Sequence, residues 1–175
     1  MALVLLVPWM CRADQNDPRL DGLFAILKSD GDPQAVRAAE AQIWRIWLDS
    51  GREDINALMR AGIMAMTNQH LDDAIRIFGQ ITERAPDFAE GWNKRATAYY
   101  LDEQYVASVR DIQHTLALEP RHFGAISGMG LIFLSRGDDQ GALAAFEAVV
   151  AIHPQAPDAR EHIEELRQRI LEHGA

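Results

Sequence analysis

A fixed repeat period is the feature of this sequence that most constrains its fold. Pro86, Pro120 and Pro154 are equally spaced along the chain. Four further columns keep the same spacing, two of small residues and two of mostly large apolar residues: Gly62, Ala96 and Gly130; Ala74, Ser108 and Ala142; Phe78, Ile112 and Phe146; Leu58, Trp92 and Ile126. A fixed period of this length is the signature of stacked units, each of which completes its core against a neighbour. The sequence therefore predicts three units, over residues 55–88, 89–122 and 123–156.

Each unit is expected to consist of two antiparallel helices. In the second unit, apolar residues recur at helical spacing over residues 92–100 and again over residues 105–116, with a polar break between the two runs. The small columns allow two helices joined by a short turn to approach closely. Each proline ends a second helix, because proline lacks the amide hydrogen and clashes with the preceding turn. Asp87, followed three residues later by Glu90, predicts a capping box that opens the second unit.

These residues resemble the tetratricopeptide repeat family, whose 34-residue pattern is W-x2-L-G-x2-Y, then A-x3-F, then P. The match is best from Trp92 to Pro120. It continues in the third unit through Gly130, Phe133, Gly137, Ala142, Phe146 and Pro154. Departures from the pattern are Arg95 in place of leucine, Ala65 in place of an aromatic residue and Asp139 in place of tyrosine. The resemblance implies an all-α fold, an α-solenoid of stacked helix-turn-helix repeats.

The segments on either side of the repeats also predict helices. Residues 14–54 hold two apolar helical patterns, the second of which opens with an N-cap and a proline, Asp32 and Pro33. We interpret these residues as a degenerate N-terminal helical pair, a first unit that caps the array. Residues 157–175 carry a narrow apolar stripe among charged residues, which is typical of a C-terminal capping helix.

Residues 1–13 contain an unbroken apolar run, Met1–Cys11, which Arg12 ends. The run is shorter than the about 20 residues needed to span a bilayer, and its length is typical of the apolar part of a secretory signal peptide. We therefore expect cleavage before Asp14 and a periplasmic or secreted protein. Because no Lys or Arg precedes the run, two alternatives stay open. The true start lies upstream of Met1, or the protein is cytoplasmic and the run is not a signal.

The composition excludes several classes of function. With 17 basic and 26 acidic residues and a net charge of −9, the chain lacks the basic surface that nucleic acid binding requires. The single cysteine, Cys11, excludes an internal disulfide and a thiolate metal cage. The six histidines form no ligand motif, and no H-E-x-x-H, C-x-x-C, G-x-S-x-G or glycine-rich phosphate loop is present. We expect no enzymatic activity, no cofactor, no metal and no integral membrane span.

The family resemblance implies that the first helix of each unit lines a concave groove that binds a segment of another protein. Transferred position by position, this role falls on nine residues: Met59, Ile63, Met66, Asn93, Thr97, Tyr100, Ser127, Leu131 and Leu134. Asn56, Glu90 and Gly124 belong to the same inward face. One branch of the family clamps the carboxylate of chaperone tails with lysines, arginines and asparagines at these places. Because this set holds no Lys or Arg, we expect a hydrophobic peptide or amphipathic helix instead.

The function expected from these features is a non-catalytic protein–protein interaction module that serves as an envelope or periplasmic adaptor or assembly factor. The alternative is a structural protein that forms a homo-oligomer through Trp44, Trp47 or the last helix. In a further alternative, a neighbouring segment of the chain itself, such as residues 1–13 when they are not cleaved, covers part of the groove.

Overall fold

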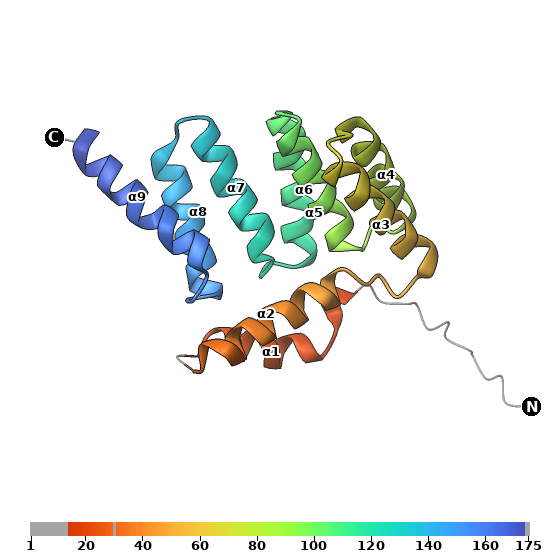
Figure 1. The fold of residues 1–175 in the computed structure, drawn as a ribbon, viewed down its shortest axis with the longest axis horizontal. Coiled ribbons are helices and arrows are strands. Elements are labelled where there is room, and N and C mark those ends of the chain that lie inside the picture. The colour runs from red at the N-terminus through yellow and green to blue at the C-terminus, as the bar shows by residue number, and fades with distance from the viewer. Residues whose placement is uncertain (1–13, 30, 174–175) are drawn as a thin grey trace, which may run out of the picture.

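The computed structural model describes residues 14–29 and 31–173 (Figure 1). Within these residues the chain forms a short 3-10 helix, Asp14–Asn16, and nine α-helices, and it contains no strand. The α-helices are α1 (Arg19–Leu27), α2 (Pro33–Trp47), α3 (Glu53–Thr67), α4 (Leu71–Arg84), α5 (Ala89–Leu101), α6 (Tyr105–Leu118), α7 (Phe123–Ser135), α8 (Asp139–Ile152) and α9 (Pro157–His173). The predicted all-α solenoid is confirmed. The predicted signal peptide, residues 1–13, lies outside the described residues.

The helices from α3 to α9 keep the period of the sequence. The second helices α4, α6 and α8 begin at Leu71, Tyr105 and Asp139, each one full period after the one before. The first helices α5 and α7 also begin one period apart, and α9 begins one period after α7, so α9 takes the place of a first helix in a fourth unit. Figure 1 shows the helices from α3 to α9 side by side in one array.

Close contact inside two of the hairpins depends on a glycine opposite a phenylalanine. A Cβ atom at Gly62 would lie 2.4 Å from the Phe78 ring, and one at Gly130 would lie 2.8 Å from the Phe146 ring. Both rings are buried against the backbone of the first helix. In the middle unit the second-helix residue is the smaller Ile112, and the first helix carries Ala96 instead of glycine. The size of each residue in one column thus follows the size of its neighbour in the other.

The turn inside each hairpin uses one residue in the left-handed conformation. Gln69, Glu103 and Gly137 have φ angles of 61°, 58° and 72° and lie at equivalent positions of the three units. The amide that follows each of them donates to a carbonyl five residues earlier, as His70 does to Ala65 over 2.9 Å. This is the Schellman ending of a helix, which favours glycine at the left-handed position.

The predicted helix caps are correct in part. The Asp32 carboxylate accepts a hydrogen bond of 3.0 Å from the Gln34 amide at the start of α2, and Asp138 caps α8 through the Gly141 amide. The capping box predicted at Asp87 and Glu90 is wrong. Phe88 holds the N-cap of α5 without a side-chain bond, because the Glu90 side chain is buried and used elsewhere.

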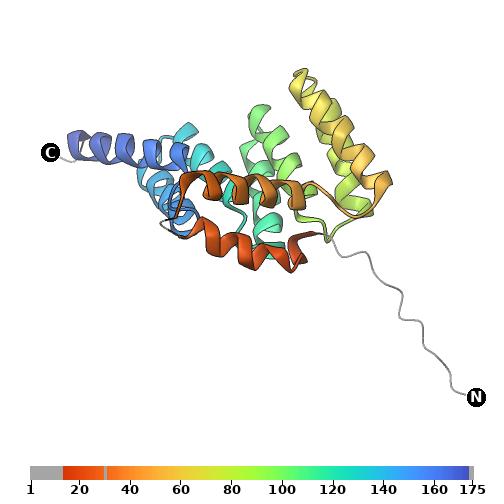
Figure 2. The same ribbon diagram turned by 60° about the horizontal axis from the view of Figure 1, so that its bottom comes forward.

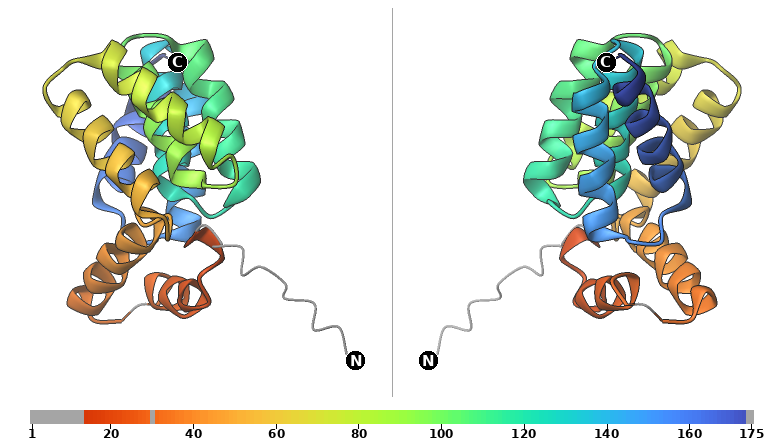
Figure 3. Two further views of the ribbon diagram at one scale, coloured as in Figure 1. Left: turned by 90° about the vertical axis from the view of Figure 1, so that its right-hand side faces the viewer. Right: turned by 90° about the vertical axis from the view of Figure 1, so that its left-hand side faces the viewer.

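The N-terminal helical pair α1–α2 does not stack on the first repeat, so the expectation of a first unit in line with the others is wrong. The pair instead lies along one edge of the array, across the ends of its helices, as Figures 2 and 3 show. Its apolar residues, Phe24 and Trp47 among them, form one core with Phe123 of α7, Phe146 of α8 and residues of α9. The contacts explain this position: the two tryptophans of α2, Trp44 and Trp47, both pack on the buried rings of residues 122 and 123.

The last helix α9 packs on α8 as the cap of the array, with Ile163 and Leu166 buried. Leu171, close to its end, remains 68% exposed. Among the described residues, no helix is long and apolar enough to cross a membrane.

Candidate functional site

A cavity of about 210 Å³ lies between α5 and α7. Its lining is mostly apolar and reaches back to α6: Asn93, Ala96, Thr97, Tyr100, Ser108, Ile112, Gly124, Ala125, Ser127, Gly128 and Leu131. No carboxylate, ammonium, guanidinium or imidazole group of the described residues lines it. We refer to this space as the α5–α7 cavity.

Two glycines of the third unit line the α5–α7 cavity, and one of them, Gly128, leaves room for it. Gly124 and Gly128 lie one helical turn apart on α7, on the face that meets α5. The equivalent residues of the second unit are Glu90 and Lys94, which carry long side chains. A Cβ atom at Gly128 would lie 3.5 Å from Ile112 Cδ1, which is an ordinary contact distance. The packing against α6 therefore does not require a glycine at this position. The effect of Gly128 is to leave the cavity empty where a side chain would otherwise project.

Most polar groups of the cavity wall are already used inside the fold. The Thr97 hydroxyl donates to the Asn93 carbonyl over 2.9 Å, and the Ser108 hydroxyl donates to the Ala96 carbonyl over 2.8 Å. The Asn93 side chain is 5% exposed, and its amide nitrogen donates to Glu90 Oε2 over 3.1 Å. The Asn93 side-chain oxygen accepts no hydrogen bond from the described residues.

A buried charge network lies behind Asn93. Glu90 is fully buried on α5 and accepts hydrogen bonds from Asn93 and from His122 Nε2, the latter over 2.8 Å. Lys94 Nζ lies 3.0 Å from the other carboxylate oxygen of Glu90. His122 Nδ1 accepts a bond from the Ala125 amide, so a neutral imidazole carries its proton on Nε2 and donates to Glu90.

The electrostatics of Glu90 favour its charged form. Burial by itself would raise the pKa of this carboxyl, because a charge is less stable away from water. The charge of Lys94 and the hydrogen bond from His122 outweigh burial, and the pKa of Glu90 lies below its ordinary value. The network therefore presents a buried carboxylate beside the cavity and no unpaired cation.

The helix α2 packs against the start of α7 beside the α5–α7 cavity. A Cβ atom at Gly124 would lie 2.5 Å from the Trp44 ring, so this ring rests on the Gly124 backbone. Trp47 stacks on the His122 imidazole, and Lys94 Nζ lies 5.5 Å from the centre of the Trp44 ring.

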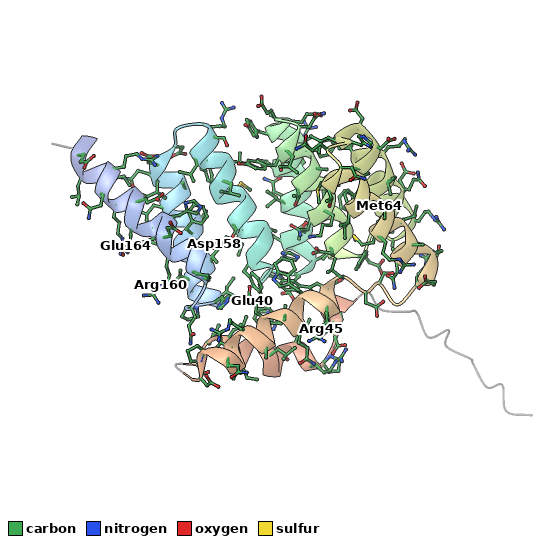
Figure 4. The ribbon with its side chains drawn as sticks, in the orientation of Figure 1. Glu40, Arg45, Met64, Asp158, Arg160 and Glu164 are labelled. Carbon is green, nitrogen blue, oxygen red and sulfur yellow. The ribbon has the colours of Figure 1, made fainter. Side chains whose placement is uncertain are left out.

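Two polar contacts extend the docking of the helical pair α1–α2. Glu40 of α2 lies on the side of this helix that faces the array (Figure 4), and its carboxylate is 3.4 Å from His153 Nε2. The nearby His153 side chain lowers the pKa of Glu40 despite partial burial. Arg121 pairs with Asp21 of α1 over 2.7 Å and lies over the Phe24 ring.

The structure brings five of the nine predicted groove residues together and separates the other four. The five that line the α5–α7 cavity are Asn93, Thr97, Tyr100, Ser127 and Leu131. Met59 and Ile63 line a second cavity, of about 310 Å³, with residues at the end of α2. Met59 is almost fully buried in the core of the first unit, and its role as a groove residue stays a prediction. Met66 and Leu134 line neither of these two cavities.

The sequence reasoning missed Gly128, Ala125 and the residues that α6 contributes. The signal for Gly128 was available: its column holds Arg60, Lys94 and Gly128, so a side chain is lost in the third unit alone. Ile112 belongs to a column of large apolar residues in the second helices, whereas the predicted groove residues all belong to the first helices. Among the described residues, no three His, Cys, Asp or Glu side chains are grouped so that they could hold a metal ion.

The helical repeats of this chain also match a known family. The sequence model of the tetratricopeptide repeat matches residues 59–113 and 103–157, which together span more than half of the chain. The chain belongs to the tetratricopeptide repeat (TPR) family. A TPR repeat-containing protein of Rhizobium etli is 38% identical over 152 residues, which cover 87% of this chain and 74% of that protein.

Solved TPR domains share the fold of this TPR protein at low sequence identity. The TPR domain of Sgt2 from Aspergillus fumigatus is 22% identical, with a TM-score of 0.65, over 70% of this chain and 83% of that chain. The first TPR domain of Spaghetti, bound to the HSP90 peptide SRMEEVD, is 18% identical, with a TM-score of 0.64, over 68% of this chain and 94% of that chain. At these identities the likeness shows the fold alone.

Arg95 stands where the TPR pattern has leucine, and the structure shows how its charge is accommodated. Its guanidinium forms two hydrogen bonds with the Asp111 carboxylate, of 2.6 and 2.9 Å, and a third with the Thr82 hydroxyl. It also lies over the Trp92 ring. The pair with Asp111 raises the pKa of Arg95 and joins α5 to α6 and α4. The charge that replaces the family's leucine is thus balanced by a carboxylate on the facing helix.

Proposed function

We propose that this chain is a non-catalytic protein-interaction module that binds a hydrophobic peptide or amphipathic helix of another protein across α5 and α7. The observation that carries the proposal is the α5–α7 cavity, which opens in the face made by first helices and is lined mostly by apolar groups. A concave apolar site with a few polar groups is the usual form of a binding site. Membership of the TPR family and the peptide bound to the Spaghetti domain support the same class of function.

The chemistry of the cavity favours a ligand without negative charge. The peptide bound to the Spaghetti domain is acidic, as its letters EEVD show. The α5–α7 cavity offers no cation to such a peptide, and the whole chain carries a net charge of −9. Long-range electrostatics therefore favour a neutral or basic partner segment.

A peptide library displayed on phage tests this function. We expect selected peptides to bind the parent protein and to lose binding when Asn93→Ala and Tyr100→Ala are combined, with helicity retained in circular dichroism. Gln113→Ala provides the control, because Gln113 is exposed on α6 and does not line the cavity. Peptides that bind the double variant as tightly as the parent would move the binding surface elsewhere.

We further propose that the module works in the cell envelope, as a periplasmic adaptor or assembly factor. The support is the apolar run Met1–Cys11 and the Cys11-Arg12-Ala13 junction that precedes the first described helix. The intact mass of the native protein tests this proposal: a mature chain that begins at Asp14 is expected. A cytosolic species that retains residues 1–13 would overturn it.

Self-association is a weaker candidate than peptide binding. Trp47 is 1% exposed and Trp44 is half-buried, and both pack inside the chain rather than on a free surface. Of the surfaces suggested for a homo-oligomer, the last helix keeps one exposed large apolar side chain among the described residues, that of Leu171. Light scattering is expected to give the mass of one chain at micromolar concentration.

A further inference from the structure

We propose that the α5–α7 cavity is a pocket for one aromatic side chain of the bound segment, and that the Asn93 side-chain oxygen accepts a backbone N–H of the same segment. This inference rests on the proposed function and adds the identity of the residue that anchors the ligand. Four observations carry it: the size of the cavity, its walls, the unpaired oxygen of Asn93 and the local charge.

The size of the cavity suits a single ring. A lined apolar cavity of about 150 Å³ inside a protein binds benzene, and the α5–α7 cavity has about 210 Å³. The additional space accommodates the bond from the ring to a peptide backbone. It does not accommodate a drug-sized ligand, whose pockets are usually of about 300 Å³ or more.

The walls are mostly apolar. They include Gly128 of α7, Ala96 of α5 and Ile112 of α6, and the glycine adds no side chain to the space. Tyr100 lines the same cavity on α5, 5.9 Å from the Tyr105 ring between ring centres. A ring that enters would add an aromatic pair with Tyr100, which is more favourable than its buried area alone.

The Asn93 side chain points to the backbone of the ligand. Its amide nitrogen is fixed by Glu90, so the side-chain oxygen is the group left for a ligand. This oxygen is not one of the buried side-chain atoms that lack a hydrogen-bond partner among the described residues. It belongs to the cavity lining, where a peptide N–H beside the aromatic residue can reach it. The same geometry disfavours a carboxylate, because the fully buried Glu90 carboxylate lies 3.1 Å from the Asn93 nitrogen.

The test uses the full chain and small probes in a titration followed by amide chemical shifts. N-acetyl-phenylalaninamide supplies a phenyl ring and peptide N–H groups. We expect its shifts to centre on the amides of Gly124, Ser127 and Gly128. N-acetyl-alaninamide, which lacks the ring, and N-acetyl-phenylalanine, which carries a carboxylate, are each expected to bind about tenfold more weakly or not at all.

Gly128→Leu is the variant that fills the pocket. It is expected to weaken binding of the phenylalanine amide at least about tenfold, while circular dichroism and melting stay close to those of the parent. Gly22→Leu is the matched control, since a Cβ atom at Gly22 of α1 meets nothing within 4 Å. If Gly128→Leu does not fold, Gly128→Ala replaces it, because its single methyl group makes only an ordinary contact with Ile112.

The outcomes separate this inference from the proposed function. Probe shifts scattered over the surface, equal binding by the Gly128 variants, or equal binding of the carboxylate probe would overturn the pocket. A second outcome would support peptide binding and contradict the aromatic pocket. In it, phage-selected peptides lose binding to the Asn93 and Tyr100 double variant but bind Gly128→Leu as tightly as the parent, and their sequences show no enrichment in Phe, Tyr or Trp. If the probe binds as expected and no peptide does, the pocket stands and peptide binding fails.

Discussion

The His122 imidazole lies flat on the Trp47 indole, with ring centres 4.1 Å apart and planes 11° apart. This stack joins the end of α2 to the start of α7. On its edge the same imidazole donates to the buried Glu90 of α5. One side chain thus connects the helical pair α1–α2 with two repeats, so the docking of the pair and the charge state of Glu90 depend on each other.

Replacing His122 by alanine should destabilise the protein by about 3 kcal/mol or more, because it leaves the Glu90 carboxylate buried without its neutral donor and removes the surface under Trp47. Urea unfolding followed by tryptophan fluorescence measures the change. His114→Ala is the control: His114 also stacks on a tryptophan, Trp92, but it is exposed on α6. Equal costs for the two variants would show that the His122–Glu90 contact contributes nothing of its own.

The stability of the protein should fall on acidification because of Glu90. Its pKa is lower in the folded chain than the ordinary 4.5 that it has when unfolded. The stabilisation is therefore complete above pH 4.5 and is lost as the pH falls through the lower, folded pKa. Glu90→Gln removes this dependence, while Glu40, whose pKa is also lowered, contributes equally to both proteins. Urea midpoints that fall in parallel for parent and variant between pH 6 and about pH 3 would exclude Glu90 as a source.

The Arg95–Asp111 pair predicts strong non-additivity. Arg95→Leu restores the family's residue but leaves the buried Asp111 carboxylate unpaired, and should cost about 3 to 5 kcal/mol. The double variant Arg95→Leu with Asp111→Leu should recover most of that loss, because both charges are then absent. A double-mutant cycle on the free energy of unfolding gives the coupling. A double variant no more stable than Arg95→Leu alone would contradict the pairing.

Ala142→Leu should destabilise the third unit by about 1 to 3 kcal/mol, because the larger side chain overpacks the contact between α7 and α8. Ala142 is fully buried, whereas Ala148 on the same helix is exposed. Ala148→Leu is therefore the matched control and should leave the melting temperature nearly unchanged. An unchanged melting temperature for Ala142→Leu would mean that the small column is not in contact at this position.

The repeats could be predicted from the sequence because their contacts recur. Gly62 faces Phe78 and, two units later, Gly130 faces Phe146. The same local contact therefore places the same two residue types at the same positions of both units. The left-handed turns at Gln69, Glu103 and Gly137 are harder to recognise in the sequence, since only one of the three residues is glycine. Periodicity therefore predicts what is local and repeated.

The docking of α1–α2 could not be predicted in this way, because its contacts occur once. Trp44 rests on Gly124 and Trp47 on His122, and neither contact has a counterpart in another unit. The candidate site could be predicted only in part, because some of its residues follow the repeat and others do not. The inward face of α5 and α7 was found from the repeat, whereas the wall at Ile112 and the space at Gly128 depend on how three helices meet in one unit.

The contact between Trp47 and Phe123 also has a consequence for synthesis. The two residues are separated by 76 positions along the chain, and a ribosome adds about 5 to 20 residues per second. Trp47 is therefore made about 4 to 15 seconds before Phe123. During that interval Trp47 has only its neighbours within the pair, such as Phe24, to cover it, and a segment made before the repeats reaches its final place after them.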